Sequence, residues 1–331
     1  MVTELEGRIR RRLDSLTKPQ GSLGRLEELA LQVGLIQGTD MPWVGRKAML
    51  LFCADHGVVE EGVSPFPQEV TRQMVANFRS GGAAITVLCR QYGIEPVIVD
   101  MGVGKPTRNF AREPAMSRAE AKRAIDVGRE HANDADLLGA GEMGIGNSTA
   151  AAALLCAFTG IDPQDAAGRG TGLDNAGVTR KAEVIARALE LHRPDPADAI
   201  GVLAALGGFE IAAIAGLILG AAQKRRVVVL DGFISCSAAV VVRALEPAAL
   251  DHVVYSHRSA ERGHRRMLEF LNARPLLDLD MRLGEGTGAA IGISLIEAAV
   301  RLYREMSTFE SAAVSTAGAT SPPASQSGAA Q

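Results

Sequence analysis

Residues 47–54 have the sequence KAMLLFCA, a nearly continuous apolar run that leads directly into Asp55, His56 and Gly57. A short run of this kind is typical of a strand that is buried on both faces, as the strands of parallel sheets are. Similar runs stand at residues 94–100 (IEPVIVD) and 226–231 (RVVVLD), and each ends in an aspartate. The three runs predict strands of one sheet whose carboxyl ends carry polar side chains.

The segments between these runs have the patterns of helices. Ser117 and Glu120 have the spacing of a capping box ahead of an amphipathic helix. Further helices are expected within residues 1–40, 69–91 (with a break at Gly81 and Gly82), 150–158, 202–222, 258–272 and 287–306. Strands that alternate with helices predict an α/β fold with a mostly parallel, doubly wound (Rossmann-like) sheet. Ligands of such sheets bind beyond the carboxyl ends of the strands, where Asp55, Asp100 and Asp231 are expected.

The chain has 331 residues, enough for one large domain and a smaller one. Its net charge is -3 and aromatic residues make up only 4%, which favours binding neither to nucleic acid nor to an anionic membrane. Residues 1–12 contain no apolar stretch, so no signal peptide is predicted. The most apolar window, residues 203–222, is interrupted by Glu210, and the remainder is shorter than a membrane span. A buried core helix is expected there.

The four cysteines, Cys53, Cys89, Cys156 and Cys236, stand singly and form no C-x-x-C motif. They are expected to be reduced and buried, which fits a cytoplasmic protein. Residues 313–331 are rich in Ser, Ala, Thr, Gly and Pro without any periodicity. This tail is expected to be disordered.

Three segments carry glycine at near-alternate positions: residues 141–149 (GEMGIGNST), 168–172 (GRGTG) and 284–288 (GEGTG). Glycine allows backbone N–H groups to approach a ligand closely, and a helix N-terminus favours an anion. Asn147 or Ser148 is a candidate N-cap whose neighbours could hold phosphate oxygens. One such loop is more often a tight turn, but three in one chain favour a phosphate-binding site.

Glu142 and Glu285 each follow a glycine and precede an apolar helix. A glutamate in this place can simply complement the helix dipole. In a dry, glycine-walled pocket it can instead act as a general base, because desolvation raises its pKa toward neutral pH. The residues alone leave both alternatives open.

Motifs along the chain carry a family resemblance. They are residues 16–27 (LTKPQGSLGRLE), 54–58 (ADHGV), 141–149, 206–210 (LGGFE), 230–233 (LDGF), 256–261 (SHRSAE) and 281–288 (MRLGEGTG). In these motifs the chain resembles the nicotinate-nucleotide:dimethylbenzimidazole phosphoribosyltransferases, the family that prepares the lower-ligand nucleotide of cobalamin. The resemblance covers nearly the whole chain, from residue 16 to about residue 306. A chance match at so many separate places, in the same order, is improbable.

The resemblance implies an enzyme that transfers the 5-phosphoribosyl group of nicotinate mononucleotide to 5,6-dimethylbenzimidazole, with inversion at C1. The products are nicotinate and α-ribazole 5'-phosphate, which serves nucleotide-loop assembly of cobalamin. The resemblance further implies a homodimer. Each chain would have a large α/β domain (residues 17–251) and a small helical domain built from both chain ends (residues 1–16 and 252–312). Neither a metal nor a cofactor is implied.

The resemblance assigns the catalytic base to Glu285 and a second important carboxylate to Glu142. Met143 and Leu283 would line the base pocket. Phe66 and Met74 stand where some members carry a serine and a glutamine. A more apolar pocket is therefore expected, which selects its base mainly by shape. The substrate phosphate and ribose would lie on Gly144, Gly146, Asn147, Ser148, Thr149, Gly170, Thr171 and Gly172, with Lys181 and Asp231 nearby.

Two other functions are compatible with parts of the sequence. A metal-dependent phosphoesterase would use acids and histidines near predicted strand ends or loops, which here are Asp55, His56, Asp100, Asp231, His252 and His257. These residues lack a compact ligand spacing such as H-E-x-x-H. A nucleotide- or corrinoid-sensing module would have no need of Glu285, which is present.

Overall fold

In a computed structural model, which describes residues 3–170 and 172–315, the sheet has five parallel strands in the order β2-β1-β3-β4-β5. The strands are β1 (Lys47–Cys53), β2 (Glu95–Asp100), β3 (Leu137–Met143), β4 (Val227–Leu230) and β5 (Val253–Tyr255). The chain first adds β2 on one side of β1 and then crosses to β3 on the other side. Doubly wound sheets bind ligands at such a reversal of strand order, so β1 and β3 mark the expected site.

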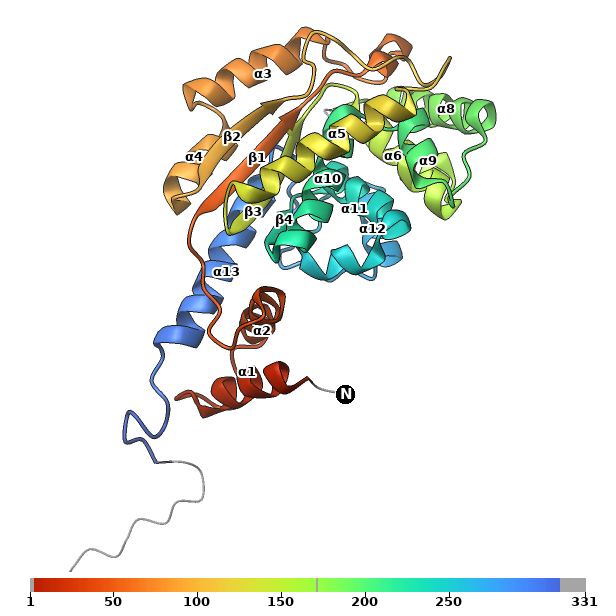
Figure 1. Ribbon diagram of the computed structural model, residues 1–331. Coiled ribbons are helices and arrows are strands. Elements are labelled where there is room, and N and C mark those ends of the chain that lie inside the picture. Colours follow the sequence, from red (N-terminus) through yellow and green to blue (C-terminus); the bar gives the residue numbers. More distant parts are fainter. Residues whose placement is uncertain (1–2, 171, 316–331) are drawn as a thin grey trace, which may run out of the picture.

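Helices cover both faces of this sheet (Figure 1). They are α1 (Glu4–Ser15), α2 (Arg25–Gln37), α3 (Glu69–Ser80), α4 (Ala84–Tyr92), α5 (Arg118–Glu130), α6 (Asn147–Thr159), α7 (Pro163–Ala166), α8 (Asn175–His192), α9 (Ala199–Leu206), α10 (Phe209–Lys224), α11 (Phe233–Leu245), α12 (His264–Leu271) and α13 (Thr287–Glu305). Short 3₁₀ turns are η1 (Gly57–Glu61), η2 (His131–Asn133) and η3 (Pro247–His252). The capping box predicted at Ser117 and Glu120 is present at the start of α5 and is confirmed.

The alternation of side chains along β1 divides the core into two layers. Leu50 and Phe52 face one layer, which contains α5, α6, α9, α10 and α11. Met49 and Leu51 face the other layer, which contains α2, α3, α4 and α13. Successive side chains of a strand point to opposite faces, so an all-apolar strand needs a cover of helices on both sides. The predicted doubly wound parallel sheet is confirmed.

The two ends of the chain meet in a separate apolar cluster, formed by Ile9, Leu13, Leu16, Ala30 and Tyr303. In Figure 1, α1 and α2 lie beside the C-terminal half of α13, away from α8 and α9. By contrast, β5 and the first half of α13 pack with the sheet, although both lie within residues 252–312. The division into domains at residues 17 and 251 stays a prediction.

The central strand, β3, was not expected from the sequence, because LLGAGEM contains two glycines and glycine is depleted in strands. Both glycines stand where neighbours approach closely. A Cβ at Gly139 would overlap Cε of Met49, and one at Gly141 would lie 2.6 Å from the carbonyl oxygen of Glu285. The missing side chains therefore let α13 and its preceding loop approach the sheet.

Two helix predictions need correction. The single helix expected over residues 202–222 is two helices, α9 and α10, separated at Gly207 and Gly208. The helix expected over residues 258–272 begins only at His264. Within the described residues, no helix has the length and apolar character to cross a membrane. All four cysteines are buried and free, as predicted. Residues 316–331, most of the predicted tail, lie outside the described residues.

Candidate active site

The two glutamates singled out in the sequence meet at the carboxyl edge of the sheet. Glu142 lies near the end of β3, and Glu285 lies just before the N-cap of α13, Gly286. A Cβ on Gly284 would lie 2.6 Å from Oε1 of Glu142, so the Glu142 carboxylate reaches the loop that carries Glu285. Only 5% of Glu142 and 7% of Glu285 are exposed. The fold thus buries two carboxylates close together, which the sequence could not establish.

The loop that carries Glu285 has an unusual backbone. Gly284, Glu285 and Gly286 all have positive φ, at 82°, 62° and 87°. Glutamate rarely adopts this conformation, and such strain persists only when the surroundings impose it. Asp231 supplies the constraint: its Oδ2 accepts from the Gly286 N–H at 2.9 Å, and its Oδ1 accepts from Gly288 at 2.7 Å.

The structure shows a role for Asp231 that the sequence did not reveal: it is 1% exposed and its carboxylate caps the start of α13. Its expected place beside the substrate's phosphate and ribose stays a prediction. An acid that accepts several N–H bonds at a helix N-terminus is well stabilised there. We conclude that Asp231 holds the Glu285 loop in place.

Burial raises the pKa of both glutamates. The pKa of Glu142 rises to about 8, mainly through desolvation, with a further contribution from the charge of Asp231 and an opposing hydrogen bond from the Asn147 side chain. The pKa of Glu285 rises to about 7, through desolvation and then the charge of Asp231. Carboxyl groups with pKa values in this range exchange protons readily at neutral pH, as general acids and bases must.

Two of the glycine loops meet at the ammonium group of Lys181. Lys181 Nζ donates to Ser148 Oγ at 3.0 Å and to the carbonyl oxygen of Gly168 at 3.3 Å. A Cβ on Gly170 would lie 2.9 Å from Ser148 Oγ and 3.2 Å from Lys181 Nζ. The structure thus brings Ser148, Gly170 and Lys181 together at the start of α6, and an anion would find both a cation and a helix N-terminus there.

Other predicted members of this anion site differ in detail. Asn147 is not the N-cap of α6, because Gly146 takes that position and the Asn147 amide donates to Glu142 instead. The hydroxyl of Thr149 is buried and has no hydrogen-bond partner among the described residues. Gly144 packs against the carbonyl oxygen of Ala54, from which a Cβ would be 2.6 Å away.

Thr171 lies outside the described residues, whereas its neighbour Gly172 has a φ of 120° and open space at the position of a Cβ.

Lys181 is almost fully buried, and desolvation lowers its pKa to about 8, against the raising effect of Glu261. A bound anion beside this ammonium group would favour its protonated form and raise the pKa again.

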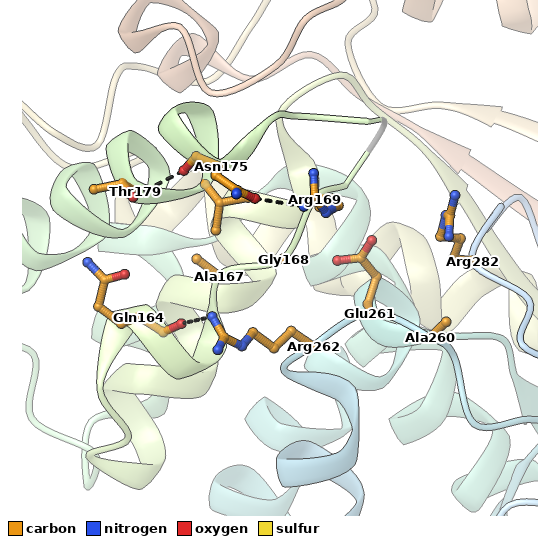
Figure 2. A pocket seen from close by; sticks show the side chains of 11 residues that line it. Gln164, Ala167, Gly168, Arg169, Asn175, Thr179, Ala260, Glu261, Arg262 and Arg282 are labelled. Atoms are coloured by element: carbon orange, nitrogen blue, oxygen red, sulfur yellow. Dashed lines mark hydrogen bonds between the residues drawn. The ribbon is translucent and has the colours of Figure 1, made fainter.

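A cavity of about 430 Å³ adjoins the second glycine loop (Figure 2). It is lined by Gln164, Ala167, Gly168, Arg169, Asn175, Val178, Thr179, Ala260, Glu261, Arg262 and Arg282. Arg169 donates to the carbonyl oxygen of Leu173 at 2.9 Å, and Arg262 donates to that of Gln164 at 2.9 Å. Sequence reasoning missed these arginines, although Arg169 and Arg282 each lie inside or beside a glycine motif. They line this cavity together with the carboxylate of Glu261.

The four predicted base-binding residues divide into two pairs. Met74 and Met143 are partly buried and pack against the same apolar cluster, which covers one face of the sheet. Phe66 and Leu283 are 46% and 57% exposed. Their role in binding the base stays a prediction, and Phe66 and Leu283 are uncovered in the single chain.

The acids and histidines considered as metal ligands fasten loops. Asp55 accepts from the Gly104 N–H at 2.7 Å, and Asp100 accepts from the Gly102 and Val103 N–H groups. His252 Nδ1 lies 3.1 Å from the carbonyl oxygen of Arg226. In the described part of the chain, no group of three or more His, Cys, Asp or Glu side chains is arranged to hold a metal ion.

Comparison with known proteins agrees with this geometry. A family model described as phosphoribosyltransferase matches residues 1–314. The nicotinate-nucleotide–dimethylbenzimidazole phosphoribosyltransferase of Chloroflexus aggregans is 51% identical over 326 residues, and the match covers 92% of each chain. The enzyme of the same name from Geobacter sulfurreducens is 49% identical, and 94% of each chain is covered.

A solved structure agrees as well. The crystal structure of CobT from Thermus thermophilus is 44% identical, with a TM-score of 0.90 over 95% of this chain and 100% of that chain. Identity at this level along nearly the full length of both chains indicates common family membership and more than a shared fold. The chain belongs to the nicotinate-nucleotide–dimethylbenzimidazole phosphoribosyltransferase family.

Proposed function

We propose that this protein transfers the 5-phosphoribosyl group of nicotinate mononucleotide to 5,6-dimethylbenzimidazole, giving α-ribazole 5'-phosphate and nicotinate for cobalamin synthesis. The activity agrees with the names of its relatives. One structural observation carries the proposal. Two buried carboxylates with raised pKa values, Glu142 and Glu285, stand at the same sheet edge as an anion site built on Lys181 and Ser148.

The reaction needs a base more than an acid. In the donor, ribose is attached to a pyridinium nitrogen that already carries a positive charge, so nicotinate leaves without receiving a proton. In the acceptor, one ring nitrogen bonds to C1 of the ribose while the second nitrogen holds a proton, which becomes acidic as the new bond forms. Glu285 accepts that proton, and its pKa of about 7 suits a general base at neutral pH.

Glu142 has a different role in this scheme. As the bond to nicotinate breaks, the ribose acquires oxocarbenium character, and a nearby carboxylate stabilises the positive charge. The same carboxylate is largely protonated in the empty site, because its pKa is about 8. A bound pyridinium cation favours the ionised form, so binding of the donor prepares Glu142 for this role. Attack from the face opposite to nicotinate inverts C1.

Lys181, Ser148 and Gly170 would hold the phosphate of the nucleotide, and the N-terminus of α6 would add its dipole. In this proposal the ribose lies between the anion site and the two glutamates. The second glycine loop, residues 168–172, would then close one side of the nucleotide site. The loops that lead into α6 and α13 would form the other walls, because both helices begin at the same sheet edge.

The proposal includes a homodimer, an apolar base pocket and a cytosolic location. Uncovered Phe66 and Leu283 support the first two, because large apolar side chains at a site edge are commonly covered by a ligand or a second chain. Four buried free cysteines support a reducing compartment.

A direct assay tests the proposed function. The purified protein is incubated with nicotinate mononucleotide and 5,6-dimethylbenzimidazole, and nicotinate and the new nucleotide are separated by chromatography. We expect equimolar formation of the two products, also in the presence of a chelator. Release of inorganic phosphate instead of nicotinate would point to a phosphoesterase and contradict the proposal.

A further inference from the structure

His56 and Glu210 form a fully buried polar pair beside the first glycine loop. His56 is the N-cap of η1, three residues after the end of β1, and Glu210 lies in the first turn of α10. His56 Nε2 lies 2.6 Å from Glu210 Oε1, and both side chains are 0% exposed. The pair stands at the switch point between β1 and β3, but the proposed chemistry uses neither residue.

Two backbone segments converge on His56, one at Gly208 and one at Gly144 and Gly146. A Cβ on Gly208 would overlap its ring at Cε1, and a Cβ on Gly144 would lie 3.3 Å from its Cδ2. A Cβ on Gly146 would lie 3.3 Å from Cβ of His56. The loop from Gly144 to Gly146, which leads into the anion site, therefore lies against this side chain without another side chain between them. The position of the ring and the position of the loop are therefore coupled by direct packing.

The pair is poorly suited to stabilising the fold. His56 Nδ1 and Glu210 Oε2 have no hydrogen-bond partner among the described residues. Burying such groups costs free energy that one hydrogen bond offsets only in part, and apolar residues of similar volume often stabilise a core equally well or better. The hydrogen bond does, however, fix the orientation of the ring against the loop.

We propose that His56 and Glu210 are a positioning pair, which holds the loop of Gly144 and Gly146 in the shape that binds the phosphate of the nucleotide. Neither residue touches the reacting atoms. The proposal rests on the proposed function, because it takes the loop as part of the nucleotide site. It deepens that function by assigning donor affinity to a buried pair that lies behind the site.

The test compares variants by two measurements: the dissociation constant of nicotinate mononucleotide, taken by calorimetry without the acceptor base, and the two Michaelis constants. Glu210→Ala frees the ring, and we expect it to weaken nucleotide binding by about tenfold or more, as the loss of a buried hydrogen bond does. Glu210→Gln keeps an oxygen acceptor at the same place, so it should restore binding to within roughly threefold. The Michaelis constant for dimethylbenzimidazole should stay nearly constant in both.

Two further variants separate positioning from stability. In His56→Leu/Glu210→Met an apolar pair fills the same space, so we expect a melting temperature at or above that of the wild type together with weakened nucleotide binding. Asp136→Asn is the matched control, because Asp136 accepts from Arg226 at the opposite edge of the same sheet. It should lower the melting temperature without changing nucleotide binding.

Three outcomes would overturn the proposal: unchanged nucleotide binding in the apolar double variant, equal damage from Glu210→Gln and Glu210→Ala, or an equal rise in both Michaelis constants. Nucleotide binding without turnover in the wild-type protein would contradict the proposed function alone. Absence of nucleotide binding in the wild-type protein would contradict both.

Discussion

Glu285 is the side chain on which the proposed reaction depends most directly. We predict that Glu285→Gln keeps the fold and loses roughly 10²- to 10⁴-fold in turnover, the usual contribution of a general base. The wild-type rate should fall below about pH 7, where Glu285 becomes protonated, and the variant should lack this dependence. Steady-state kinetics from pH 5 to 9 measures both.

The matched control is Glu297→Gln, further along α13, where the carboxylate only pairs with Lys47 and Arg301. This variant should keep nearly normal turnover. A purified, folded Glu285→Gln protein with wild-type turnover would refute the assignment of the base.

Glu142 should make the stability of the protein depend on pH. Its pKa is about 8 in the folded protein and near 4.5 in the unfolded chain. Between these values the folded protein keeps a proton that the unfolded chain releases, so the free energy of unfolding falls as the pH rises. We predict that Glu142→Gln reduces the loss of melting temperature between pH 5 and pH 8. Parallel curves for wild type and variant would show that Glu142 does not hold the proton.

Individual pocket residues should also determine which base accepts the phosphoribosyl group. With Phe66 and Met74 in place of polar groups, and with Met143 and Met74 packed against the same apolar cluster, selection should rest on shape and apolar contact. Each methyl group buried in such a pocket is worth about 1 kcal/mol, which separates methylated from plain benzimidazole by roughly 10- to 200-fold at most.

Adenine should be a poor acceptor, because its polar edge would be buried without partners. Competition assays with mixed bases measure the ranking. Equal use of adenine and dimethylbenzimidazole would mean that polar groups line the pocket.

At the scale of elements, the second glycine loop can be tested through Gly170. Its φ of 52° lies in the left-handed region, which Asp and Asn tolerate better than most residues. Gly170→Asp would place a carboxylate beside Ser148 Oγ and Lys181 Nζ, where the phosphate is expected. We predict a large rise in the Michaelis constant for the nucleotide.

Gly170→Asn is the control, because it has the same shape without the charge. It should raise this constant much less than Gly170→Asp does, because repulsion of the phosphate is absent. Equal constants in both variants would indicate a purely steric effect, and unchanged constants in both would mean that the loop is only a turn.

At the scale of the whole molecule, the exposed apolar side chains of Phe66 and Leu283 suit burial against a second copy of the chain. We predict a homodimer in solution, with a mass by light scattering of twice the 34.8 kDa of one chain. Dilution to the monomer should weaken binding of the base more than binding of the nucleotide, because the proposed phosphate contacts of Ser148, Gly170 and Lys181 come from one chain. A fully active monomer would contradict this prediction.

The sequence by itself determined the class of fold and the family. Short apolar runs such as residues 47–54 are typical of strands covered on both faces, and their terminal acids mark the ligand edge. Motifs such as residues 281–288 are specific enough to name Glu285 without a structure. These conclusions depend on local patterns, which a single sequence displays fully.

Only the tertiary structure decided how the site is assembled. The strand β3 was not expected because it contains Gly139 and Gly141, which have low strand propensity. These glycines are needed where Met49 and the Glu285 loop pack closely against the strand, and a single sequence does not reveal such contacts. The roles of Asp231 and of the His56–Glu210 pair were hidden for the same reason. Their partners are 55 and 154 residues away along the chain, and hydrogen bonds between such distant segments leave no periodic signal in the sequence.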